Sequence, residues 1–168
     1  MKNSGTNSTQ KLTTCSLLAS LTVLFQVSIG VLPGLGHILS AAGVLPISLA
    51  GIISPGTALM GVGVAAWLTF VILPHEFPFF ILCIAPMGVI LGCSIHLSLK
   101  SPIPILAATG ALAAGMMILS FSLGIPAFGP FQANASYFAI FLFYIGFSFV
   151  YSIVWYSFIM KMKKRLKL

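Results

Sequence analysis

Residues 137–160 read YFAIFLFYIGFSFVYSIVWYSFIM, an apolar run that contains no charged residue and no proline. At about 1.5 Å of rise per residue, a helix of roughly 24 residues extends about 36 Å, enough to cross a bilayer with modest tilt. The basic tail KMKKRLKL follows directly at 161–168. Because Lys and Arg clustered beside a span stay on the cytoplasmic side, we predict a transmembrane helix with a cytoplasmic C-terminus.

The whole chain has the composition of a membrane-embedded protein. Of its 168 residues, 59% are hydrophobic and 5% are charged, and the mean hydropathy is +1.13. A soluble domain carries about a quarter charged residues. The net charge of +7 comes from basic residues at the flanks of apolar runs, so we expect the lipid bilayer, and no nucleic acid, as a partner. The three cysteines lie in apolar runs without metal-ligand spacing, and we predict buried thiols, no metal and no cofactor.

Five further apolar runs precede the last one, and Pro- and Gly-containing turns separate them. The fold class we predict is an all-α integral membrane bundle of six helices at 12–160, between a disordered tail at 1–11 and the basic tail. The expected spans are 12–31, 38–53, 57–73, 79–99, 105–123 and 137–160. The run at 38–53 is short and contains Pro46, so it is either a kinked span or a re-entrant segment. The many small residues of 105–123 predict the most enclosed helix.

Counting back from a cytoplasmic C-terminus assigns a side to every connection. With six spans, the N-terminal tail with Lys2 and Lys11 and the connection with Lys100 all lie inside, as the positive-inside rule requires. A five-span arrangement would place Lys2 and Lys11 outside. We therefore predict both termini in the cytoplasm of what we expect to be a bacterial plasma membrane. The residues that determine this topology are Lys100, Lys161, Lys163, Lys164, Arg165 and Lys167.

Two of the three histidines, the only acidic residue and two amide side chains fall in the connections that this topology places on the outer side. The candidate substrate-binding residues are His37, His75, Glu76, Gln132 and Asn134. Hydrogen-bonding groups at one mouth of an apolar bundle favour a small-molecule site, whereas a pore needs polar side chains through its whole depth. The alternative interpretation is that these are ordinary polar residues of interfacial loops.

Other sequence features limit the chemistry. We predict no enzyme, because the chain lacks paired carboxylates in its spans, and His75-Glu76 has no second histidine at the metalloprotease spacing. Tyr144 and Tyr151 are seven residues apart and share one helix face. They either form hydrogen bonds between helices or stack on a ligand.

The first predicted helix carries small residues at helical spacing, Ser16-x-x-x-Ser20 and Cys15-x-x-x-Ala19, which permit close helix contact. With this face, its length, six spans and cytoplasmic termini, the chain resembles the substrate-binding S component of energy-coupling-factor vitamin transporters. That family typically has Ala-x-x-x-Ala at this place. The resemblance implies that Ser16, Ala19 and Ser20 dock on a membrane coupling subunit and that ATPase subunits supply the energy. It also implies that the outer polar residues bind a vitamin-like molecule for uptake.

A second function stays open at this point. The chain can be a non-transporting membrane scaffold or assembly protein that contacts other proteins or anionic lipid through its helix faces and its basic tail. Such a protein would have no saturable ligand.

Overall fold

The computed structural model describes residues 8–32, 34–126 and 136–166. In these ranges the chain is helical without a strand, and six helical segments are long and apolar enough to cross a membrane. The predicted all-α, multi-pass membrane bundle is therefore confirmed. The six spans are Thr9–Val31, Leu35–Ile53, Pro55–Ile72, Phe77–His96, Pro102–Ser122 and Tyr137–Arg165.

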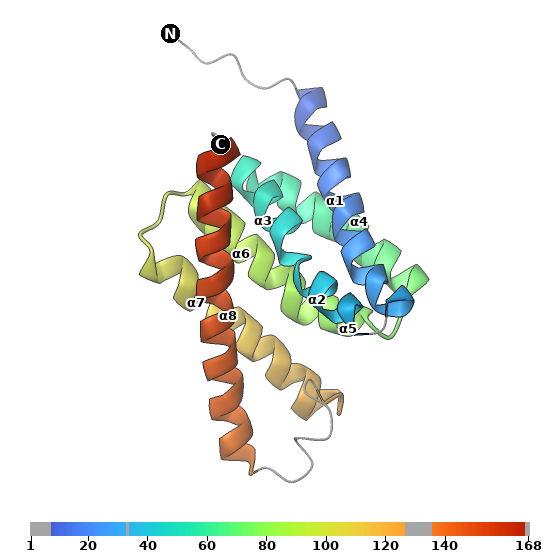
Figure 1. Ribbon diagram of the computed structural model, residues 1–168, viewed down its shortest axis with the longest axis vertical. Helices are drawn as coiled ribbons and strands as arrows, with labels where there is room; N and C mark the ends of the chain where they lie inside the picture. The colour runs from blue at the N-terminus through green and yellow to red at the C-terminus, as the bar shows by residue number, and fades with distance from the viewer. Residues whose placement is uncertain (1–7, 33, 127–135, 167–168) are drawn as a thin grey trace.

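Three of the six spans are single helices and three are interrupted (Figure 1). The uninterrupted helices are α1 (Ser8–Val31), α4 (Pro55–Ile72) and α8 (Tyr137–Leu166). The second span divides into α2 (Leu35–Ala41) and α3 (Val44–Ile53). The fourth runs through α5 (Phe77–Phe79), the π-helical segment η1 (Phe80–Ile84) and α6 (Ala85–His96). The fifth joins α7 (Pro102–Met117) to a second π-helical segment, η2 (Ile118–Ser122).

The break in the second span lies at Ala42 and Gly43, not at Pro46. Pro46 sits in the first turn of α3, where its missing N–H has no helical partner to lose. A Cβ at Gly43 would lie 2.7 Å from Nε2 of Gln26, so a glycine lets α1 approach the break. The segment Leu35–Ile53 is nevertheless long and apolar enough to cross the membrane, which favours a broken span over a re-entrant one.

Because successive spans run in opposite directions, alternate connections between them lie at the same end of the bundle. The start of α1 and the end of α8 lie together, as Figure 1 shows, with the α3–α4 and α6–α7 connections near them. The opposite end holds the α1–α2 turn, the α4–α5 turn and the end of η2. We call the first the basic end, because the described Lys and Arg residues lie in or beside its elements.

The centre of the bundle is the contact between α3 and α6, where glycines let the two backbones approach. A Cβ on Gly51 would lie 2.9 Å from the Cα of Gly92.

The prediction that 105–123 forms the most enclosed helix is wrong. In an 18-residue window of its span 44% of the residues are buried, against 61% in the window of Leu35–Ile53 and 56% in that of Phe77–His96. Its small residues are divided between a packed face and an exposed face that includes Ala107, Gly110 and Ala114.

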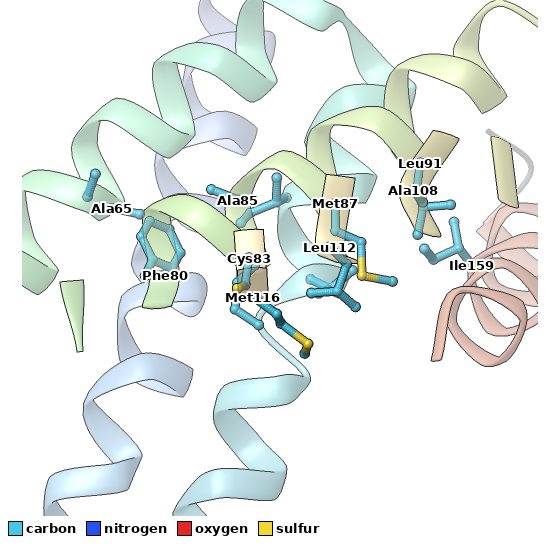
Figure 2. Packing of buried hydrophobic residues seen from close by; sticks show 14 of the residues in the cluster. Ala65, Phe80, Cys83, Ala85, Met87, Leu91, Ala108, Leu112, Met116 and Ile159 are labelled. Atoms are coloured by element: carbon cyan, nitrogen blue, oxygen red, sulfur yellow. The ribbon is translucent and has the colours of Figure 1, made fainter. Parts of the chain in front are cut away.

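The apolar core continues from α6 to α7 and α8 (Figure 2). Side chains from η1 and α6 run beside side chains from α7 in antiparallel order: Cys83 with Met116, Met87 with Leu112 and Leu91 with Ala108. Cys15 and Cys83 are buried as predicted, Cys93 is half-buried, and all three thiols are free. Residues of this core, among them Ile84, Leu112 and Met116, also line the cavity described below.

Candidate small-molecule site

A cavity of about 460 Å³ lies at the end of the bundle opposite the basic end. Sites for small molecules in proteins commonly enclose about 300–1,000 Å³. The α1, α2, η1, α7, η2 and α8 segments and the α4–α5 turn all contribute to its wall. Its polar lining consists of His37, Ser40, His75, Glu76 and Tyr151. A cavity shared by so many elements is a property of the tertiary fold rather than of one loop.

Three of the five predicted substrate-binding residues line this cavity. His37 comes from the first turn of α2, and His75 and Glu76 come from the turn between α4 and α5. Gln132 and Asn134 lie outside the described residues. The fold therefore brings the three described residues to the wall of one cavity.

Glu76 is the only acidic residue of the chain, and its side chain is 18% exposed. It occupies the N-cap position of α5 but makes no capping hydrogen bond. Its Oε1 lies 3.7 Å from Nε2 of His75, whose side chain is 66% exposed. The contact is an ion pair only when the imidazole is protonated, and the described part of the chain shows no other contact between a carboxylate and a basic side chain. A charge-assisted hydrogen bond is about 2.7–2.9 Å long, so this contact leaves acceptor capacity on the carboxylate.

Each of the three helix interruptions contributes to the cavity wall. Ser40 and Ala41 come from the end of α2 at the break, Ile84 from η1 and Leu119 from η2. Irregular backbone at membrane depth persists where protein or a cavity covers it, and π-helical turns are frequent at functional sites. The π-helical segments were not predicted from the sequence, because an i→i+5 turn has no residue signature.

A buried polar pair holds the helix break next to the cavity. Gln26, fully buried on α1, donates through Nε2 to the Ser40 carbonyl at 3.2 Å, and the Ser40 hydroxyl donates to Gln26 Oε1 at 2.9 Å. Sequence reasoning missed Gln26. A lone amide inside the apolar run 12–31 was the available signal, because polar residues within spans are costly and face the bundle interior.

Both tyrosines singled out from the sequence form hydrogen bonds between helices. The Tyr144 hydroxyl contacts the Ser120 hydroxyl of η2, and the Tyr151 hydroxyl donates to the Ala41 carbonyl at 2.9 Å. Tyr151 also lines the cavity, so its structural role and a ligand contact are compatible. Beyond these polar groups the described part of the wall is apolar and contains no Lys or Arg. Its apolar residues come from α1, α2, α5, η1, α7, η2, the segment after η2 and α8.

The proposed docking face of the first helix divides between two surfaces. Cys15 and Ala19 are buried against α4, and Cys15 Sγ lies 2.9 Å from the Thr57 carbonyl oxygen. Ser16 and Ser20 are exposed. Of the predicted docking residues, only these two serines are therefore open to a partner, and Ala19 packs inside the chain.

Basic residues occupy the other end of the molecule. Lys100 lies between α6 and α7, and Lys161, Lys163, Lys164 and Arg165 lie in the last turns of α8. Lys163 Nζ is 3.5 Å from the Ile95 carbonyl oxygen, and His96 Nδ1 is 2.7 Å from that of Ile52. Cationic and hydrogen-bonding side chains thus meet the C-terminal ends of α6 and α3. Lys167 lies outside the described residues.

Comparisons with protein-family models, with curated proteins and with solved structures found no match for this chain. Within the described ranges, no group of three or more His, Cys, Asp or Glu side chains is placed to hold a metal ion.

Proposed function

We propose that this protein is a membrane-embedded substrate-binding subunit that takes up a small, vitamin-like molecule. The observation that carries the proposal is the cavity of about 460 Å³ that joins His37, His75 and Glu76 to an apolar interior. A few convergent polar groups on an otherwise apolar concave wall are typical of small-molecule sites. The polar groups would select the ligand, because a wrong ligand would leave them buried and unpaired.

The distribution of charge supports an outward-facing cavity. The described basic residues lie at the end opposite the cavity, and Lys and Arg next to spans favour the cytoplasmic side. In this orientation both chain ends are cytoplasmic and the site receives its ligand from outside the cell, across a plasma membrane.

Transport would need a conformational change and a source of energy. The break at Ala42 and Gly43 lies beside the cavity, and we propose that a change in the angle between α2 and α3 at this break opens and closes the site. We propose that ATPase subunits act through a membrane coupling subunit that contacts the exposed Ser16 and Ser20 side of α1.

The test is extraction of the tagged protein in mild detergent, with mass spectrometry of the small molecules and the proteins that accompany it. We expect a stoichiometric metabolite in the wild type and its loss in Ala41→Leu, which places a larger side chain in the cavity wall. Ala114→Leu is the matched control, because Ala114 is exposed on α7 away from the cavity. A wild-type protein that carries no metabolite, or that elutes with an envelope assembly instead, would favour the scaffold function.

A further inference from the structure

We infer that the ligand of this cavity is a compact amphipathic organic cation whose single positive charge lies against Glu76. The inference rests on the proposed function and specifies its substrate class. It follows from the charge of the cavity lining, from the aromatic rings that line the same cavity and from the apolar remainder of the wall.

The fixed charge of the lining is negative. Glu76 is the sole acidic side chain of the chain, and no Lys or Arg is among the described residues that line the cavity. His37 and His75 in their neutral form each offer one donor and one acceptor, so they can bind polar groups without adding charge. A carboxylate that is largely withdrawn from water is stabilised by a cation and destabilised by a second anion. The lining therefore favours a positively charged ligand over an acidic one.

The carboxylate is placed to receive such a group. It does not cap α5, and its contact with His75 at 3.7 Å is longer than a charge-assisted hydrogen bond. Its side chain is 18% exposed and contributes to the cavity wall, so a ligand in the cavity can approach it. A ligand ammonium could form a shorter, charge-assisted contact with Glu76 than the 3.7 Å contact with His75.

Aromatic rings line the same space. Phe79, Phe147 and Tyr151 contribute to the wall, and the Phe147 and Tyr151 rings stack with their centroids 5.6 Å apart. The faces of aromatic rings attract cations, and this attraction is stronger where water is excluded. The rings therefore add a second preference for positive charge and also offer a flat surface for a ring of the ligand.

The rest of the described wall is apolar and suits an uncharged part of the ligand. Met116, Leu119 and Ile125 offer only apolar side chains, and a second charge among them would be desolvated without a partner. A volume of about 460 Å³ accommodates a ligand of one or two rings. The predicted ligand thus has one cationic end and one apolar or aromatic end.

The experiment compares three probes that share a naphthalene ring and differ in charge: naphthylmethyl-trimethylammonium, naphthylethanol and naphthylacetate. The full-length protein is reconstituted in phosphatidylcholine nanodiscs, and binding is measured by equilibrium dialysis. We expect the cation to bind about 10-fold or more tightly than the alcohol, with the acetate weakest. Glu76→Gln should bring the ratio of cation to alcohol affinity close to one, and Glu76→Asp should retain most of it.

Because the readout is a ratio within one variant, retained binding of naphthylethanol shows that Glu76→Gln is folded. A cation preference that persists in Glu76→Gln overturns the role of Glu76. Equal or tighter binding of the alcohol or the acetate by the wild type overturns the cationic class. If that binding is lost in Ala41→Leu but not in Ala114→Leu, the small-molecule site stands. Failure of all three probes also overturns the class, and the co-purified metabolite then decides the proposed function separately.

Discussion

The Tyr151 hydroxyl on α8 donates a hydrogen bond of 2.9 Å to the carbonyl of Ala41, 110 residues earlier in the chain. Ala41 ends α2, and the N–H of Leu45, which would bond its carbonyl in a continuous helix, bonds that of Ala42 instead. Tyr151 therefore takes the place of a missing backbone donor. This contact ties the last helix to the break in the second span at the wall of the cavity.

Replacing Tyr151 by Phe should leave the Ala41 carbonyl without this partner. We expect a loss of about 1 kcal/mol in stability, in the range measured for hydrogen bonds between membrane helices, and a lower melting temperature in detergent. Tyr156→Phe is the matched control on the same helix, because no hydrogen bond of its hydroxyl is found within the described residues. Equal melting temperatures for the two variants would contradict the proposed tie.

The Gln26–Ser40 pair should behave as a coupled unit. Gln26→Leu and Ser40→Ala each leave a buried polar side-chain group unpaired, at a cost of about 1–3 kcal/mol. The double variant removes both partners of this side-chain bond, while the Ser40 carbonyl keeps its bond from the Gly43 N–H. We therefore expect the double variant to be less destabilised than the sum of the two single variants. A double-mutant cycle from thermal or denaturant unfolding measures this coupling. Strict additivity would show that the two side chains do not act together.

Much of the architecture follows from apolar run lengths, since a membrane demands helices of about 20 residues with internally satisfied backbones. His37, His75 and Glu76 share one end because alternate connections of an up-and-down bundle must do so. Run lengths and the order of connections do not show how deep in the membrane a side chain lies or which way it points. They therefore could not show that Ser40 and Tyr151 complete the cavity wall.

The interruptions were harder to derive. Pro46 marked the second span as irregular, but the break lies before it, since a proline fits the first turn of a new helix. The exact place depends on Gly43, which faces Gln26 of another helix. Ala19 was assigned to a partner because small residues fit any close helix contact, and here α4 of the same chain fills that position. Such choices depend on three-dimensional neighbours that spacing alone does not identify.

The close approach of α3 and α6 predicts strong sensitivity at Gly92. A Cβ there would overlap the Ser48 carbonyl oxygen and lie 2.9 Å from the Cα of Gly51, and both neighbours are backbone atoms that cannot rotate away. We expect Gly92→Ala to lower the free energy of unfolding by about 2–4 kcal/mol and to reduce the yield of folded protein. Gly146→Ala is the matched control, since a Cβ at Gly146 meets no atom within 4 Å. Similar melting temperatures for the two variants would contradict the packing.

The orientation that places the cavity outside can be tested by labelling from one side of the membrane. Ser122→Cys introduces an exposed thiol at the end of η2, near the cavity end but not in its lining, and Ser101→Cys introduces one at the start of α7, at the basic end. The native Cys15 and Cys83 are buried and Cys93 is half-buried within a span, so wild-type protein gives the baseline.

Because Lys and Arg favour the cytoplasmic side, a membrane-impermeant maleimide added to intact cells should label Ser122→Cys and leave Ser101→Cys at baseline. Permeabilised cells should label both variants, which controls for the reactivity of the thiols. The reverse result in intact cells would place the cavity on the cytoplasmic side, and an uptake subunit that receives its ligand from outside would then be excluded.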